Sequence, residues 1–287
     1  MRVTIFGATG MLGKALLRRW KNKHNTDEVT GLGSAKADIR DFAQVERAMQ
    51  QSNPDWVVLS AAYTDVDGCE LNPALAAAVN TSGAVNVARA AAVAGARLLF
   101  VSTDYVFDGT KSTPYETADA RNPINAYGRS KAEAEEKILS ILPDVCVVRT
   151  SWLFGPGGKC FPDTILKLAA RLPETEVAIV VNDQRGCPTY TLDLADAIVA
   201  LCKSEARGIV HCTNRGECSW YDFAVEIIGQ AGLKTVVRPT TSDKFVRPAP
   251  RPKYSVLSSA SLAKYGIEMR PWQKTLSDYL LERTQST

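Results

Sequence analysis

A short apolar segment that runs directly into a glycine-rich turn constrains the fold of this chain more than any other feature. Arg2–Phe6 has the composition of a buried strand, and Gly7, Gly10 and Gly13 follow it at three-residue intervals. Residues 14–20 then have the apolar spacing of a helix. A strand, a glycine turn and a helix in this order predict the first part of a βαβ unit.

Each of the three glycines has a distinct role in a turn of this kind. Gly7 permits the tight turn, Gly10 lets the backbone approach a pyrophosphate, and Gly13 lets the helix pack closely on the strand. Phosphates then bind the free N–H groups and the positive dipole of the helix N-terminus. The pattern favours a dinucleotide site, and the alternative is a glycine turn that binds no ligand. The residues of the turn that would line such a site are Gly7, Thr9, Gly10, Met11, Leu12 and Gly13.

Strands and helices alternate along the first half of the chain. The apolar patterns predict strands at residues 2–6, 28–32, 56–60, 98–102 and 145–150, and helices at 11–21, 41–50, 73–94 and 126–142. This alternation predicts an α/β fold with a Rossmann-like, doubly wound parallel sheet. Right-handed crossovers place the carboxyl ends of the strands at one edge of the sheet, where open sheets bind their ligands.

The second half of the chain is less regular. Short strands are expected at 178–181 and 208–212, and helices at 162–172, 192–202, 220–231 and 271–281. The prolines of residues 242–253 exclude regular structure, so this segment is expected to be an ordered loop or a lid. We expect residues 1–150 to form an NAD(P)-binding Rossmann domain, to which segments near 190–215 return. Residues 151–287 are expected to form mostly a smaller α/β substrate-binding lobe.

Tyr127 and Lys131 lie four residues apart in the helix expected at 126–142. Positions with this spacing share one face of a helix. A free tyrosine titrates near pH ~10, and a neighbouring cation lowers its pKa. A tyrosine placed in this way can exchange a proton with a carbonyl or alcohol oxygen. The same spacing arises by chance in many helices, so the interpretation depends on the other motifs of the chain.

Polar residues stand at the carboxyl end of the strand expected at 98–102, namely Ser102, Thr103 and Asp104. A hydroxyl at this edge can hydrogen-bond the substrate oxygen that Tyr127 protonates. The alternative is a strand cap and a turn, since Ser, Thr and Asp favour such positions. Segments 61–63 and 149–152 are expected at the same edge.

The charge of the chain excludes some classes of partner. A net charge of +3 over 287 residues is too mild to indicate nucleic-acid or membrane binding. No apolar run reaches the ~18 residues that span a membrane, because Arg89 and Arg97 interrupt the longest one. No signal peptide is expected, since the first residues already form a strand and a turn. The basic residues Arg247, Arg251 and Lys253 are interpreted as a local anion site.

The cysteines indicate neither disulfides nor a metal. They are seven in number and form no Cys-x-x-Cys motif, and the chain has two histidines. A zinc site is therefore not expected. Free thiols in a reducing cytoplasm are the expected state, and Cys146 and Cys202 have the surroundings of core residues.

Several motifs together carry a resemblance to a known family. Beyond the glycine turn they are 102–107 (STDYVF), 127–131 (YGRSK), 149–152 (RTSW), 182–189 (NDQRGCPT) and 251–252 (RP). Over essentially its whole length, the chain resembles the extended short-chain dehydrogenase/reductases and, within them, the dTDP-4-dehydrorhamnose reductase family. The resemblance implies a dTDP-sugar substrate and a cytoplasmic step of sugar biosynthesis. In that step NAD(P)H reduces the C4 carbonyl of dTDP-4-dehydro-L-rhamnose to give dTDP-L-rhamnose.

The resemblance assigns catalytic roles to three residues. Tyr127 is the proton donor. Lys131 holds the nicotinamide ribose and lowers the Tyr127 pKa. Thr103 contacts the substrate oxygen.

The resemblance also implies a substrate site. Asp104 and Trp152 would border the sugar, and the indole would offer it a flat apolar wall. Gln184 and Arg251 would hold the nucleotide diphosphate, since a guanidinium matches the fork of a diphosphate.

The end of the second expected strand bears on the choice of cofactor. NAD-preferring sites usually have an acidic residue there that binds the ribose diol. Residues 29–34 read VTGLGS, without Asp or Glu, and Ser34 or Lys36 could attract a 2′-phosphate. NADPH is therefore the expected cofactor, with NADH accepted by some members of the family. The other residues expected to contact the cofactor are Asp38, Ile39, Ala61, Ala62, Tyr63, Tyr127 and Lys131.

Two alternatives remain open on the sequence alone. One is a 4-ketoreductase for another nucleotide-linked deoxysugar, which would share the motifs and the fold. The other is a non-catalytic, NADP-binding regulatory subunit of the methionine adenosyltransferase type, against which an intact Tyr127 and Lys131 argue. Some members of the family dimerise around magnesium held by glutamates, one of them in the first helix. Ala15 stands there, so no metal is expected, while a homodimer is left open.

Overall fold

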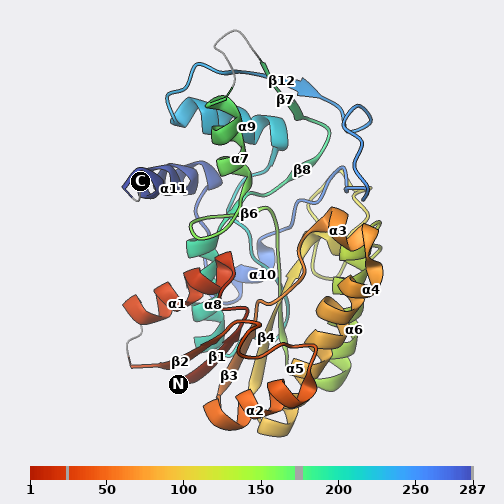
Figure 1. The fold of residues 1–287 in the computed structure, drawn as a ribbon, viewed down its shortest axis with the longest axis vertical. Helices are drawn as coiled ribbons and strands as arrows, with labels where there is room; N and C mark the ends of the chain where they lie inside the picture. Colours follow the sequence, from red (N-terminus) through yellow and green to blue (C-terminus); the bar gives the residue numbers. More distant parts are fainter. Residues whose placement is uncertain (24–25, 172–176, 286–287) are drawn as a thin grey trace.

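The computed structural model describes residues 1–23, 26–171 and 177–285. The central strands are β1 (Arg2–Phe6), β2 (Glu28–Leu32), β3 (Trp56–Leu59), β4 (Arg97–Thr103), β5 (Cys146–Thr150) and β10 (Gly208–His211). Within the described residues they form one parallel sheet in the order β10-β5-β4-β3-β1-β2 (Figure 1). The predicted Rossmann-like, doubly wound parallel sheet is confirmed.

Helices cover both faces of this sheet (Figure 1). On one face α1 (Met11–Lys23) packs against α8 (Thr191–Lys203). The other face carries α2 (Phe42–Ser52), α5 (Ala84–Ala94) and α6 (Ala126–Ile141). Across the described residues, no helix has the length and apolar character needed to cross a membrane.

The alternation of side chains along the strands supplies both cores. Val3 and Ile5 of β1 pack in the core that contains α1 and α8, whereas Phe6 packs in the core that contains α2 and α5. In β3, Val58 and Val57 divide in the same way. A strand buried on both faces is mostly apolar, as β3 is throughout and β1 is apart from Arg2 and Thr4.

The helix predicted at 73–94 is divided in the structure. α4 (Pro73–Ala76) leads into a π-helical segment, η1 (Ala77–Gly83), before α5 begins. Asn80 in this segment is buried: its Oδ1 accepts the Tyr63 backbone N–H at 2.7 Å, and its Nδ2 donates to the Tyr63 carbonyl at 3.0 Å. π-Helical turns are rare within α-helices and are often found at functional sites. Apolar periodicity encodes neither this turn nor the contact that Asn80 makes with the distant Tyr63 backbone.

The start of α6 fixes part of the proline-rich segment 242–253. The Asn125 side chain caps the helix, accepting the Gly128 N–H at 2.8 Å, and its Nδ2 donates to the Pro250 carbonyl at 2.9 Å. Residues 242–253 contain no helix or strand, as their prolines predicted.

The rest of the described chain forms short elements. The strand pairs are β7 (Val177–Val181) with β12 (Val236–Thr240), β8 (Arg185–Gly186) with β11 (Cys218–Ser219), and β6 (Leu153–Phe154) with β9 (Thr189–Tyr190). The remaining helices are α3 (Val66–Leu71), the 3₁₀ turn η2 (Asp104–Val106), α7 (Phe161–Ala169), α9 (Trp220–Gln230), α10 (Ala260–Ala263) and α11 (Trp272–Gln285). β7, α8, α9, β10 and α11 agree with prediction to within a few residues. α7 ends at Ala169, and the predicted end at Leu172 lies outside the described residues.

Part of the second half returns to the central sheet. β10 pairs with β5, with His211 opposite Arg149, and α8 packs against α1. The assignment of residues 1–150 to the cofactor and of 151–287 mostly to the substrate stays a prediction.

All seven cysteines are free and buried. Cys146 and Cys202 lie in the hydrophobic core, as their surroundings in the sequence indicated.

Gly13 is packed so tightly that it has no room for a side chain. A Cβ there would lie 2.1 Å from the Gly7 carbonyl oxygen. Gly13→Ala is expected to lower the free energy of unfolding by about 1–3 kcal/mol, the usual cost of overpacking. In α9, a Cβ on Gly229 would meet no atom within 4 Å, so Gly229→Ala should leave stability unchanged or raise it. Urea denaturation of both variants measures the difference, and equal stabilities would contradict this packing.

Candidate functional site

A cleft runs along the carboxyl edge of the central sheet. Its larger part is a cavity of about 420 Å³ at the ends of β1, β4 and β5 and beside α6. A cavity of about 310 Å³ adjoins it and shares Gly7, Gly10, Ser60 and Ala62 with it. The two cavities together are called the cleft below. It lies where open α/β sheets bind their ligands.

Within the glycine turn, Gly7 and Gly13 have no room for a side chain, whereas Gly10 does. Gly7 has a φ of +90°, and a Cβ there would lie 2.5 Å from the Ala61 nitrogen. Gly10 has only the Gly7 carbonyl oxygen within 4 Å of its Cβ position, at 3.4 Å. The side of Gly10 that faces the cleft is therefore open to a ligand. Together with the N-terminus of α1 it fits a pyrophosphate, so these residues fit a dinucleotide.

Most residues predicted to bind a cofactor line the cleft. They are Gly7, Thr9, Gly10, Met11, Leu12, Gly13, Ser34, Asp38, Ile39, Ala61, Ala62, Tyr127 and Lys131. Lys36 and Tyr63 are not part of this lining. Lys36 is exposed at a turn, and the backbone of Tyr63 makes two hydrogen bonds with the Asn80 side chain.

Arg40 lines the cleft beside Asp38, and the sequence analysis missed it. Its Nε lies 3.0 Å from both carboxylate oxygens of Asp38, and its Nη2 lies 2.5 Å from Oδ2. These hydrogen bonds hold the pKa of Asp38 below its usual range. Asp38 is the one acidic side chain among the described residues that line this end of the cleft. Its pairing with Arg40 offsets the negative charge that would repel a 2′-phosphate.

The three predicted catalytic residues meet in the larger cavity. α6 contributes Tyr127 and Lys131, and the end of β4 contributes Thr103. Burial raises the pKa of Tyr127 above its usual range, and a hydrogen bond with the Thr103 side chain opposes the rise. The geometry thus places a protonated phenol beside a hydroxyl at the edge of the sheet.

Lys131 does not act on Tyr127 as predicted. Its Nζ is turned to the Val101 carbonyl, to which it donates at 2.7 Å, and it lies 3.9 Å from the centre of the Phe100 ring. Lys131 is only 2% exposed, and this burial lowers its pKa to about 7, while the charge of Glu135 opposes the fall. The predicted lowering of the Tyr127 pKa is therefore wrong for this structure, because burial dominates at both residues.

A buried ion pair lies one helical turn beyond Lys131. Glu135 is fully buried and accepts from Ser102 Oγ at 2.5 Å and from Arg149 Nε and Nη2 at 3.0 and 2.7 Å. Arg149 is 1% exposed, and its Nη1 lies 3.4 Å from His211 Nε2. Burial and the nearby Arg149 lower the pKa of His211 to about 3, so this imidazole is neutral. The pair joins α6 to β4 and β5 directly behind the predicted catalytic residues.

Asp104, which the resemblance implied would border the sugar, lines the cleft and is almost fully buried. Ser255 Oγ donates to its Oδ2 at 2.6 Å, and Thr103 Oγ1 donates to its Oδ1 at 3.0 Å. Burial nevertheless raises the pKa of Asp104 to about 7. Near neutral pH this side chain can therefore donate as well as accept a hydrogen bond.

The residues predicted to hold a diphosphate lie outside the cleft lining. Arg251 donates to one carboxylate oxygen of Asp67 on α3, and Arg247 Nη2 pairs with the other at 2.6 Å. Burial alone would raise the pKa of Asp67, but the two arginines hold it well below its usual range. An internal carboxylate thus fills the predicted anion site. Gln184 is likewise absent from the lining.

Trp152 lines the cleft with a stacked partner that the sequence analysis missed. Its ring stacks on that of Trp220, with centroids 3.5 Å apart and 6° between the planes. Its φ of +46° is uncommon for a residue other than glycine. Gly186 makes room for the stack, since a Cβ there would lie 2.5 Å from Trp152 Cε2. No local signal links the two tryptophans, because they are far apart in the chain.

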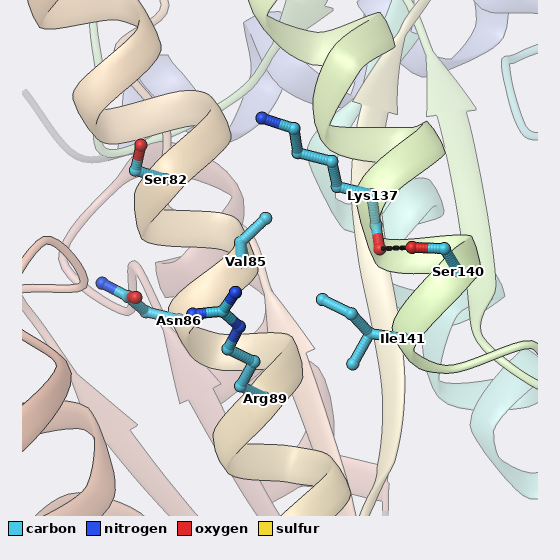
Figure 2. A pocket seen from close by; sticks show the side chains of 7 residues that line it. All are labelled: Ser82, Val85, Asn86, Arg89, Lys137, Ser140 and Ile141. Atoms are coloured by element: carbon cyan, nitrogen blue, oxygen red, sulfur yellow. Dashed lines mark hydrogen bonds between the residues drawn. The ribbon is translucent and has the colours of Figure 1, made fainter.

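A separate cavity of about 460 Å³ lies between α5 and α6 (Figure 2). Val85 and Arg89 line it from α5, and Lys137 and Ile141 line it from α6 (Figure 2). It shares no residue with the cleft, and no carboxylate or thiol lines it among the described residues. The cleft therefore remains the candidate active site.

Comparison with known families assigns the chain. The family model described as the RmlD substrate binding domain matches residues 1–285. The chain belongs to this family. Within it, a dTDP-4-dehydrorhamnose reductase of Mycobacterium tuberculosis is 41% identical over 294 residues, which cover 100% of this chain and 94% of the relative.

Two further relatives bear on substrate and cofactor. A dTDP-4-keto-6-deoxy-D-glucose reductase of Streptomyces niveus is 37% identical over 279 residues, covering 96% of this chain and 95% of the relative. The crystal structure of a dTDP-4-dehydrorhamnose reductase from Bacillus anthracis in complex with NADP is 36% identical, with a TM-score of 0.92. The match covers 98% of this chain and 99% of that one. The family expected from the motifs is confirmed.

The buried Glu135–Arg149 pair is expected to dominate the stability of this edge. Glu135→Gln leaves a buried guanidinium without its counter-charge and should lower the free energy of unfolding by about 3–5 kcal/mol. The matched control is Glu133→Gln on the same helix, which disrupts the exposed Glu133–Lys137 pair. It should change stability by at most about 0.5 kcal/mol. Denaturant unfolding of both variants compares them, and similar losses would refute the role given to burial.

Proposed function

We propose that the chain is an NADPH-dependent reductase that converts the C4 carbonyl of dTDP-4-dehydro-L-rhamnose to the alcohol of dTDP-L-rhamnose. One observation carries the proposal. Tyr127, Lys131 and Thr103 line a cleft that continues over a glycine turn open at Gly10. The names of the M. tuberculosis and B. anthracis relatives support the substrate and the cofactor.

The cofactor would lie along the glycine turn. NADPH, when bound, supplies the reducing equivalent for a carbonyl carbon. Gly10 and the N-terminus of α1 would receive the pyrophosphate. Ser34 and Arg40, which line the other end of the cleft, would meet the 2′-phosphate. NADH, which lacks this phosphate, would bind without the contact to Arg40.

Tyr127 would donate its phenolic proton to the substrate oxygen as the alcohol forms. The raised pKa keeps the phenol protonated at neutral pH, which is the state a proton donor needs. Thr103 would hydrogen-bond the same oxygen. Lys131 would hold the nicotinamide ribose, and the field of Glu135 favours the charged form of its ammonium group.

The sugar would lie against Asp104 and Trp152, which line the cleft. A carboxyl group with a pKa of about 7 can donate to or accept from a sugar hydroxyl. The stacked rings of Trp152 and Trp220 would give the sugar ring a rigid apolar wall. Cytoplasmic location, a homodimer and the absence of nucleic-acid and membrane partners remain predictions, and the free, buried cysteines support the first.

A reductase for another dTDP-linked deoxysugar is the second candidate, because the S. niveus relative is named for dTDP-4-keto-6-deoxy-D-glucose. The test is a panel of dTDP-4-keto sugars, with NADPH consumption followed by absorbance. Turnover with dTDP-4-dehydro-L-rhamnose above the other sugars supports the proposal. Faster turnover of another sugar favours the second candidate. Bound NADPH without turnover of any sugar would favour a regulatory role.

Tyr127→Phe is expected to reduce kcat/KM by about 10²–10⁴-fold, the usual contribution of a general acid. The affinity for NADPH should stay unchanged, because the variant removes only the phenolic hydroxyl. Tyr221→Phe on α9, which is not part of the cleft lining, serves as the control. Steady-state kinetics and NADPH fluorescence titration measure the two effects. Retained turnover in the Tyr127 variant would show that another group donates the proton.

Arg40→Ala is expected to weaken NADPH binding about tenfold, as loss of a charge-assisted hydrogen bond to phosphate does. NADH binding should change little, so the preference for NADPH narrows. Arg47→Ala on α2, an exposed arginine outside the cleft lining, controls for the loss of one positive charge. Titration of each protein with both cofactors gives the ratio. An equal loss for NADPH and NADH would exclude recognition of the 2′-phosphate by Arg40.

A further inference from the structure

Lys159 lines the cleft, and no motif of the sequence pointed to it. Three cations line the cleft among the described residues. Two of them have internal partners: Lys131 donates to the Val101 carbonyl, and Arg40 pairs with Asp38. Lys159 is exposed and makes no hydrogen bond or ion pair within the described part of the chain. Its ammonium group is therefore free to meet an anionic ligand.

The segment 155–159 (GPGGK) is fixed over the first turn of α1. Lys14 Nζ donates to the Gly157 carbonyl at 2.9 Å. Gly157 has a φ of +86°, and a Cβ there would lie 2.9 Å from Lys14 Cδ. A Cβ on Gly158 would lie 2.8 Å from Met11 Cβ. Only a glycine-rich backbone can lie this close to the helix, and the lysine that follows is thereby held beside the open glycine turn.

We propose that Lys159 binds a pyrophosphate at this end of the cleft. Lysine is a compact point charge on a flexible stem, which suits a pyrophosphate. Its charge adds to that of the free N–H groups and the dipole at the N-terminus of α1. The pyrophosphate is that of the dinucleotide cofactor or that of the nucleotide sugar, and the inference rests on the proposed function for their presence. If the pyrophosphate is that of the nucleotide sugar, Lys159 takes the role that the resemblance had assigned to Arg251.

Binding measurements on three variants test this assignment. Lys159→Met removes the charge and keeps the stem, Lys159→Arg keeps the charge, and Lys264→Met removes an exposed charge outside the cleft lining. NADPH and dTDP are the probes, titrated separately and without turnover. Lys159→Met should weaken one of them about five- to tenfold, and Lys159→Arg should retain most of the affinity. The loss should shrink at high salt, since the contact is exposed.

The probes distinguish the two sources of pyrophosphate. A loss for NADPH alone assigns Lys159 to the cofactor, and a loss for dTDP alone assigns it to the nucleotide sugar. A loss for both places it between the two ligands. Unchanged affinity for both probes, or an arginine variant as weak as the methionine variant, would overturn the proposal. Thermal unfolding of each variant excludes misfolding as the cause of a loss.

Failure of the proposed function would be visible separately. If no dTDP-4-keto sugar is reduced while NADPH binding still depends on the charge at position 159, the substrate proposal is wrong and the role of Lys159 stands. If turnover is normal and neither probe responds to Lys159→Met, the role of Lys159 is wrong and the substrate proposal stands.

Discussion

The buried carboxylate of Glu135 is the interaction on which the catalytic edge of the sheet depends. It belongs to α6 and accepts hydrogen bonds from Ser102 on β4 and Arg149 on β5, so three elements meet at one charge. A buried charge is costly unless it is both paired and hydrogen-bonded. Folding therefore favours the one register in which all these donors reach it. Lys131 lies one turn earlier on α6 and Thr103 directly follows Ser102, so the same register positions both of them.

Burial shifts two ionisable groups of the cleft in opposite directions. It lowers the pKa of Lys131 and raises that of Asp104, each to about 7. A neutral Lys131 with a protonated Asp104 has the same net charge as a charged Lys131 with an ionised Asp104. A proton can therefore pass between the two side chains without a change in the net charge of the cleft. A ligand that stabilises the charged form of Lys131 or of Asp104 can thus change the protonation state of these two side chains near neutral pH. In contrast, burial raises the pKa of Tyr127, so this phenol stays protonated at neutral pH.

The parts of the fold that the sequence predicted are those set by local pattern. β1 and β2 agree with prediction at every residue. Asn125 caps α6, which begins at Ala126 as predicted, so that Tyr127 lies in its first turn. The tight and open positions of the glycine turn also followed from the spacing of its glycines. These features depend on residues that are neighbours in the chain or share one helical face, so that apolar period and glycine spacing are sufficient to find them.

What the sequence could not predict depends on distant partners. The π-helical segment contains Asn80, whose side chain contacts the distant Tyr63 backbone, and the Trp152–Trp220 stack joins residues of different elements. The pairing of Arg251 with Asp67 is of the same kind. The basic residues of the proline-rich segment were interpreted as an anion site, and in the structure Arg247 and Arg251 pair with the Asp67 carboxylate. Whether the anion is a ligand or a carboxylate of the chain itself is decided only by which segments pack together.

The pairing of Arg251 with Asp67 also constrains the segment 242–253. A diphosphate could take the place of Asp67 only if its contacts with Arg251 exceeded those of a complete, largely buried pair, and Asp67 would then lose its counter-charges. The Asn125 side chain holds the same segment at Pro250. The segment is thus attached at two places, to α3 through Asp67 and to the start of α6 through Asn125. A diphosphate entering the cleft gains more from Lys159, which has no partner to give up among the residues that the structure describes.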